Sequence, residues 1–158
     1  MTRNNIFLFL FIGVLSILFL PGSAAFAEKP SREAVVAPRV PADKMGEAQA
    51  LTNPLPQDAG VIAKGRELYL GKGACASCHG AEGKGDGQLA ESFNPPPRDF
   101  TGQDNYGWHE ARTDGEIYWS IAQGTDMGMM AFGDMISQEE CWQLVSFIRS
   151  LRKNGASR

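Results

Sequence analysis

Apolar residues recur at helical spacing in three stretches of the chain after residue 57. The clearest stretch follows Ser137, which stands three residues before Glu140 and forms a capping box with it. The apolar positions then fall at i, i+3, i+4, i+7 and i+10, and they are Cys141, Leu144, Val145, Ile148 and Leu151. Gly155 beyond the stripe is typical of a helix end. The pattern predicts a final helix with an apolar stripe along it.

Two shorter helices are predicted upstream. Between residues 58 and 71 apolar residues keep helical spacing. Gly65 lies inside this stretch, where glycine costs about 1 kcal/mol relative to alanine, so we expect another backbone to pass close by. A second capping box, Thr113 with Glu116, opens a helix that stops at Gly124. No segment has a convincing strand pattern, and the predicted fold class is therefore all-α.

The first 27 residues resemble an export signal. Arg3 supplies a positive start, residues 6–20 are apolar and uncharged, and the Ala25-Phe26-Ala27 sequence offers a cleavage site before Glu28. The apolar run is shorter than the ~20 residues of a spanning helix, although an uncleaved anchor is the alternative. After cleavage no membrane span is expected. We predict a periplasmic, exported protein.

The remaining chain divides into three parts. Residues 28–58 are interrupted by prolines and are predicted to form a tether, with a short helix within 42–51. Residues 59–154 form one domain, and 155–158 form a C-terminal tail. Without residues 1–27 the chain has 18 acidic residues and 14 basic residues, because only Arg3 is lost. This acidic balance excludes a nucleic-acid protein of the usual basic kind.

The most specific motif is Cys75-Ala76-Ser77-Cys78-His79, which is the C-x-x-C-H attachment sequence of c-type haem. The two thiols can add to the vinyl groups of a porphyrin, and the adjacent histidine can bind its iron. A thioredoxin-like pair needs a preceding strand, and a zinc site needs more ligands than Cys141 and His109 supply. A structural disulfide does not require the histidine. The sequence predicts one covalent haem.

These features resemble the class I cytochrome c family, a small helical domain wrapped around one covalent haem. The resemblance covers residues 59–152 and includes Gly65-x-x-x-Tyr69, the haem motif, a proline loop, a methionine-rich loop and Trp142-x-x-Val145-x-Phe147-Ile148. It implies that the first and last helices cross with Gly65 against Phe147. It also implies His79 and a methionine as the two axial ligands.

Four methionines and one histidine are candidates for the second axial ligand, namely Met127, Met129, Met130, Met135 and His109. Family members often carry Met-Pro-Ala-Phe-Gly before the last helix. Residues 129–133 match this segment with a methionine replacing the proline, which favours Met129 and leaves Met130 and Met127 as alternatives. His109 is expected in a loop, exposed or facing a haem propionate. A copper(I) site in the methionine cluster is disfavoured by the upstream haem motif.

Further contacts to the haem are expected from the loops. The resemblance implies that a carbonyl of Pro95, Pro96 or Pro97 accepts a hydrogen bond from His79. Three other side chains are candidate donors to the haem propionates, and they are Arg98, Tyr106 and Trp108. Cys141 lies on the apolar stripe and is predicted to be a buried small hydrophobe, with disulfide-linked dimerisation as the alternative.

The sequence therefore predicts an exported electron carrier with haem c as cofactor and transient redox proteins as partners. Such a protein is not an enzyme. The first alternative is a haem subunit held in a periplasmic dehydrogenase or reductase complex. The second is an open-site haem enzyme or gas sensor, in which the methionine loop leaves the iron free.

Overall fold

The computed structural model describes residues 31–102 and 107–152, which form helices joined by loops. In chain order these are α1 (Arg32–Val36), α2 (Met45–Ala50), α3 (Ala59–Leu70), α4 (Ala76–His79), the 3-10 helix η1 (Ala90–Ser92), α5 (Trp108–Ala111), α6 (Asp114–Gln123) and α7 (Gln138–Ser150). No strand occurs among the described residues, which confirms the all-α class. The predicted signal and C-terminal tail lie outside them.

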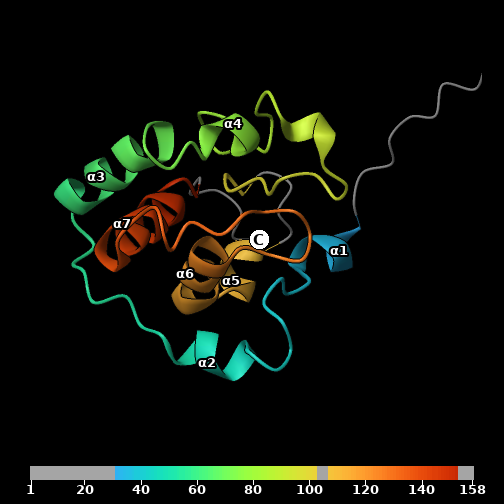
Figure 1. Ribbon diagram of the computed structural model, residues 1–158, viewed down its shortest axis with the longest axis horizontal. Coiled ribbons are helices and arrows are strands. Elements are labelled where there is room, and N and C mark those ends of the chain that lie inside the picture. The colour runs from blue at the N-terminus through green and yellow to red at the C-terminus, as the bar shows by residue number, and fades with distance from the viewer. Residues whose placement is uncertain (1–30, 103–106, 153–158) are drawn as a thin grey trace, which may run out of the picture.

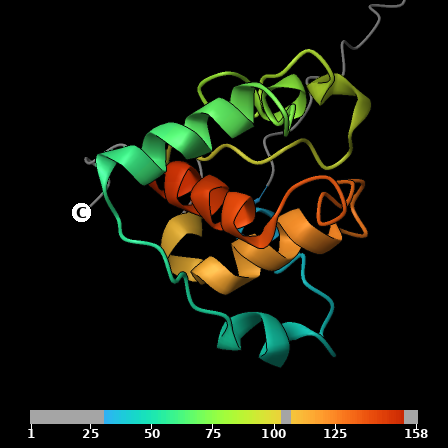
Figure 2. The ribbon, with the colours of Figure 1, turned by 60° about the vertical axis from the view of Figure 1, so that its left-hand side comes forward.

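Helices α3 and α7 cross each other (Figures 1 and 2). Gly65 permits the close approach, because a Cβ atom at this position would lie 2.0 Å from the Gln143 carbonyl oxygen and 2.8 Å from Phe147 Cβ. One turn along α3, the Tyr69 ring packs edge-on against Phe147 with 5.1 Å between ring centroids. The predicted packing of Gly65 against Phe147 is confirmed.

Both predicted capping boxes are present. The Thr113 hydroxyl accepts a hydrogen bond from the Glu116 backbone, and the Ser137 hydroxyl accepts one from the Glu140 backbone. Each glutamate in turn accepts from the backbone N–H of its capping residue. These caps orient α6 and α7 so that their apolar faces meet in the core, which contains Ile117, Ile121, Leu144, Val145 and Ile148.

The described part of the N-terminal segment lies against the helical domain. Helix α2 falls within the predicted range 42–51 and packs against α6. Ala48 is fully buried there, and a Cβ atom at Gly115 would lie 2.0 Å from the Ala48 carbonyl oxygen. The predicted tether is thus in contact with the domain, whereas the domain boundaries stay predictions. None of the described helices has the length and apolar character to cross a membrane.

Candidate functional site

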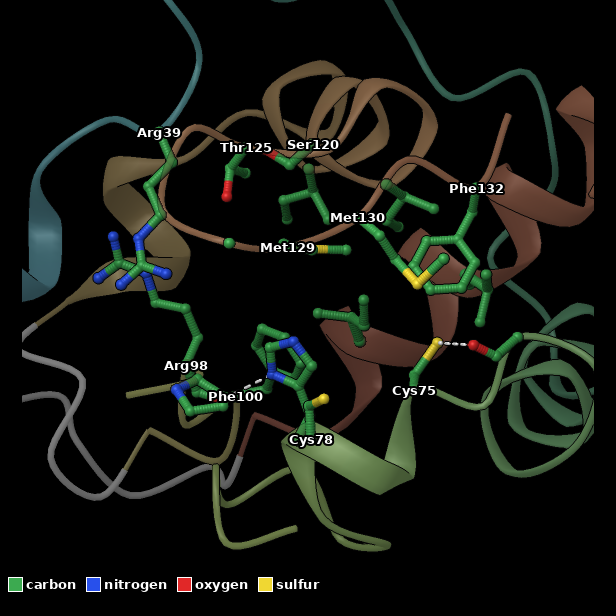
Figure 3. Close-up of a pocket in the computed structure, with 18 of the residues that line it drawn as sticks. Arg39, Cys75, Cys78, Arg98, Phe100, Ser120, Thr125, Met129, Met130 and Phe132 are labelled. Carbon is green, nitrogen blue, oxygen red and sulfur yellow. Dashed lines mark hydrogen bonds between the residues drawn. The ribbon is translucent and has the colours of Figure 1, made fainter. Parts of the chain in front are cut away.

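The Cys75–His79 motif occupies one short helical turn that follows α3. The chain leaves α3 at Gly71 and turns through Ala74, which has a left-handed φ of 47°. The carbonyl of Cys75 then accepts hydrogen bonds from the backbone of Cys78 at 3.2 Å and of His79 at 2.9 Å. Residues three apart on such a turn share one face, so the two cysteine side chains rise from the same side of α4 (Figure 3).

A cavity of about 500 Å³ lies over this face of α4 (Figure 3). Cys75, Cys78 and His79 line one wall, and Met129 lies across the cavity from the two cysteines. Apolar side chains from several elements complete the lining, among them Val40, Phe93, Phe100, Ile117, Leu144 and Ile148. The cavity is large enough and apolar enough for a cofactor.

His79 is held in a fixed orientation. Its Nδ1–H donates to the Arg98 carbonyl at 3.1 Å, and its ring stacks on Phe100 with 4.6 Å between centroids and 21° between planes. The bond keeps the proton on Nδ1, so Nε2 carries the lone pair that a metal needs. Burial lowers the pKa of His79, which favours the neutral, ligating ring.

The acceptor for His79 corrects the sequence prediction by one residue. The prediction named a carbonyl of Pro95, Pro96 or Pro97, but the bond goes to Arg98. The Pro97 carbonyl instead faces Gly85, where a Cβ atom would lie only 2.6 Å from its oxygen. Pro97 nevertheless lines the cavity.

The methionine loop has one member held more closely than the rest. Met129 is partly buried and packs against the core, whereas Met127, Met130 and Met135 are 48%, 61% and 46% exposed. The Met129 carbonyl accepts a hydrogen bond from the Thr125 backbone at 2.8 Å. A thioether is a soft ligand suited to haem iron, and the Met129 side chain extends into the cavity in Figure 3.

Two arginines converge at one end of the cavity (Figure 3). Arg98 donates from Nη2 to the Ala37 carbonyl at 2.9 Å, and burial together with the nearby charges of Arg39 and Arg112 lowers its pKa to about 9. Burial also lowers the pKa of Arg39, whose Nε has no hydrogen-bond partner. Arg112 is paired with Glu116 at 3.2 Å. Among the described residues, no carboxylate pairs with Arg39 or Arg98, and both cations lie beside an apolar cavity.

The Cytochrome c family model matches residues 62–152 of the chain. The chain belongs to the cytochrome c family. This span includes the haem motif, the methionine loop, most of α3 and all of α7, in agreement with the class I resemblance. A search of curated proteins gave no match.

Several solved structures are similar to this cytochrome. A reducing HAO-like protein complex of Kuenenia stuttgartiensis matches at 28% identity and a TM-score of 0.52, over 63% of this chain and 47% of that one. The c-type cytochrome KustC0563 matches at 31% identity and a TM-score of 0.48, over 56% of this chain and 98% of that one. Cytochrome cL from Hyphomicrobium denitrificans matches at 25% identity and a TM-score of 0.46, over 60% of this chain and 49% of that one. The cytochrome thus spans about half the length of the first of these chains.

The residues of the cavity fit the cofactor of the family. One haem c is attached covalently to this cytochrome through Cys75 and Cys78. Burial raises the pKa of Cys75 to about 11 in the folded domain. The apolar walls suit a porphyrin. The guanidinium groups of Arg39 and Arg98 at one end of the cavity suit the two carboxylates of the porphyrin, and the buried Nε of Arg39 has no other described partner.

Trp108 and His109 lie side by side on α5 but face different surroundings. Trp108 is buried, lines the cavity and packs against Phe100 with 5.3 Å between ring centroids. The sequence predicted that His109 lies in a loop and is either exposed or faces a haem propionate, and this prediction is wrong. It lies inside α5, is 6% exposed, does not line the cavity, and donates from Nε2 to the Phe100 carbonyl at 2.6 Å. Tyr106 lies outside the described residues.

Cys141 is a core residue of this cytochrome. It is 1% exposed on α7, which confirms the prediction of a buried small hydrophobe. Burial raises the pKa of its thiol to about 11. A protonated thiol inside the core is unreactive, so we expect no disulfide through this residue while the domain is folded.

Sequence reasoning missed Arg39 altogether. This residue belongs to the proline-interrupted segment, where no hydrophobic period places a side chain relative to the domain. The only local signal is the neighbouring Val40, an apolar residue that proves to be 6% exposed.

Proposed function

We propose that this chain is an exported electron carrier whose haem iron is bound by His79 and Met129. When bound, haem c supplies a one-electron Fe(III)/Fe(II) couple. The observation that carries the proposal is the arrangement of the cavity, with an oriented neutral imidazole on one wall and the least exposed loop methionine across from the cysteines.

The chain's own residues would keep the site unchanged between redox states. Cys75 and Cys78 fix one edge of the cofactor to α4, and the Arg98 carbonyl with the Phe100 ring prevents His79 from rotating. A ligand set that does not move keeps the reorganisation energy of electron transfer low. Thioether ligation by Met129 favours the ferrous state relative to a second imidazole.

Apolar residues around the cavity would exclude water from the iron. Leu144 is fully buried, and Ile117 and Ile148 are each 5% exposed behind the cavity. With both His79 and Met129 bound to the iron and water excluded, no place would be left for a substrate at the metal. This favours an electron carrier over an open-site haem enzyme or gas sensor.

The partners would be other redox proteins, met after export to the periplasm. Transient electron-transfer encounters use small interfaces. A second candidate is a haem subunit of an enzyme complex, because one similar structure is a reducing HAO-like protein complex, although this chain covers only 47% of that one. Co-purification of a stoichiometric partner from the native host would favour the subunit, and a monomer in gel filtration would favour the free carrier.

The test of the ligand set is the visible spectrum of Met129→Ala beside Met130→Ala, each made in a host that attaches haem to C-x-x-C-H proteins. We expect M129A to lose the thioether-to-iron charge-transfer band and to bind CO readily when reduced, while M130A behaves as wild type. Loss of the band in M130A alone would transfer the ligand role to Met130. Loss in neither variant would contradict methionine ligation from this pair.

A Cys75→Ser, Cys78→Ser double variant tests the attachment. We expect its haem to be removed by acidified organic solvent, and the wild-type haem to stay with the polypeptide. Extraction of haem from the wild-type protein would contradict the covalent site.

A further inference from the structure

The segment from residue 37 to residue 51, here called the N-terminal clasp, is held to the domain at both ends. At its start the Ala37 carbonyl accepts a hydrogen bond from Arg98 Nη2 at 2.9 Å. At its end α2 packs against α6, with Ala48 fully buried over Gly115. Between these anchors Val40 is 6% exposed and lines the cavity. The clasp therefore forms part of the cavity wall.

Arg39 is the charged residue that the clasp brings to the cavity. Its side chain extends from the clasp toward that of Arg98, which comes from the proline loop on the other side (Figure 3). Neither guanidinium forms an ion pair with a described residue, and the buried Nε of Arg39 has no hydrogen-bond partner. Both arginines are half-buried and carry like charges that repel each other, so this arrangement is costly until anions are bound. Glu116 does not supply them, because it is paired with Arg112.

We propose that Arg39 and Arg98 together bind the two propionates of the haem, so that the N-terminal clasp is held closed by the cofactor and raises its reduction potential. The proposal rests on the proposed haem function and extends it to a segment outside the span that matches the family model, residues 62–152. Two guanidiniums match two carboxylates in charge, and arginine binds carboxylates with paired hydrogen bonds.

The sign of the effect on the potential follows from charge. The ferric site carries one more positive charge than the ferrous site, so a cation held nearby in a low-dielectric cavity disfavours oxidation. Removing the Arg39 charge therefore lowers the potential. We expect a shift of the ferric–ferrous equilibrium by about threefold to tenfold, where tenfold corresponds to about 59 mV for a one-electron couple.

The first experiment compares the midpoint potentials of the holoprotein variants Arg39→Gln, Arg39→Lys and Arg66→Gln. Arg66 is exposed on α3 and does not line the cavity, so R66Q controls for the loss of one charge. We expect a lower potential in R39Q, a potential near that of wild type in R66Q, and recovery of most of the difference in R39K. Equal potentials in R39Q and R66Q would overturn the proposal. An equal fall in R39Q and R39K would assign the effect to packing and would also overturn it.

The second experiment measures closure of the clasp by cleavage after Glu47, an exposed residue of α2, with a glutamate-specific protease. The substitutions at residue 39 leave this cleavage site unchanged. We expect at least a several-fold faster cleavage in R39Q than in wild type or R66Q. Equal rates in all three proteins would show that the cofactor does not hold the clasp.

A third variant covers the case in which R39Q does not retain a folded structure. Arg39→His carries a charge that is lost as pH rises through about 6.5, so one folded protein can be measured with and without it. As pH rises through this range, we expect the midpoint potential of R39H to fall more steeply than that of wild type. The same pH dependence of the midpoint potential in both proteins would overturn the proposal. If the thioether-to-iron charge-transfer band is intact and the substitutions at residue 39 do not change the potential, the electron-carrier function still stands. A wild-type chain without covalent haem would instead contradict the proposed function itself.

Discussion

Replacing Gly65 by alanine is expected to force apart the two helices that close the domain. The added Cβ atom would lie 2.0 Å from the Gln143 carbonyl oxygen and 2.7 Å from its carbonyl carbon, and ordinary contact begins at 3.4 Å. Both atoms belong to the α7 backbone, which cannot rotate away as a side chain would. The helices must therefore separate by roughly 1 Å or more at the crossing.

The magnitude is the difference between two opposing effects. Overpacking a close-packed site costs typically about 1–3 kcal/mol, and here the separation also loosens the contact between Tyr69 and Phe147, which are 0% and 4% exposed. Against this, alanine is favoured over glycine inside a helix by about 1 kcal/mol. Because the added Cβ atom meets backbone atoms that cannot move aside, we place the overpacking cost at about 3 kcal/mol and expect a net destabilisation of about 2 kcal/mol. For a domain of about 100 residues this lowers Tm by roughly 8–16 °C.

The measurement is reversible unfolding of the holoprotein in denaturant, followed by far-UV circular dichroism. Gly46→Ala in α2 is the matched control, since a Cβ atom at Gly46 has no neighbour within 4 Å. We expect G46A to be as stable as wild type or more stable by up to about 1 kcal/mol. A G65A protein as stable as G46A would refute the view that Gly65 is required by the helix crossing.

Three further predictions concern single groups. Tyr69→Phe removes the buried hydrogen bond from the tyrosine hydroxyl to the Gly80 carbonyl, 2.8 Å long, and should lower the free energy of unfolding by about 1–3 kcal/mol in the same assay. The hydrogen bonds from Lys72 and from the Ser137 backbone lower the pKa of Glu140, so the stabilising effect of its carboxylate is present at neutral pH and is lost as pH falls below about 4. In Glu140→Gln the free energy of unfolding should therefore fall less as the pH is lowered through this range. The same pH dependence in E140Q and wild type would contradict the prediction. Cys141, with its pKa raised to about 11, should resist alkylation by iodoacetamide at pH 8 until the protein unfolds, as mass spectrometry of the labelled peptide would detect.

Local patterns were sufficient for the long helices of the domain. Capping boxes at Thr113 and Ser137 predicted where α6 and α7 begin, because the caps satisfy backbone donors within the same few residues. The glycine inside α3 could be interpreted as a contact because nothing local explains it. The haem motif was equally readable, since its chemistry needs residue types at a fixed spacing in one turn.

The parts that were missed depend on how loops are placed in space. Helix α5 has four residues and no side-chain cap, so its sequence carries no periodic signal, and His109 was misplaced with it. The acceptor for His79 was off by one residue, because the direction of a carbonyl in a proline loop is set by contacts such as that with Gly85. Arg39 is brought to the cavity by long-range contacts, namely the packing of α2 on α6 and the hydrogen bond from Arg98 to the Ala37 carbonyl, and its own sequence neighbourhood shows neither of them. The choice of Met129 as ligand stays a prediction.

The crossing of α3 and α7 links the order of synthesis to the order of assembly. The cysteines that receive the cofactor follow α3 directly, whereas Gln143 and Phe147, against which α3 packs, come about seventy residues later. A chain emerging from its N-terminus thus presents an open attachment sequence, still accessible to the machinery that modifies it, well before its enclosing shell exists. Once the last helix arrives, its Leu144 and Ile148 side chains complete the wall of the cavity beside the modified turn.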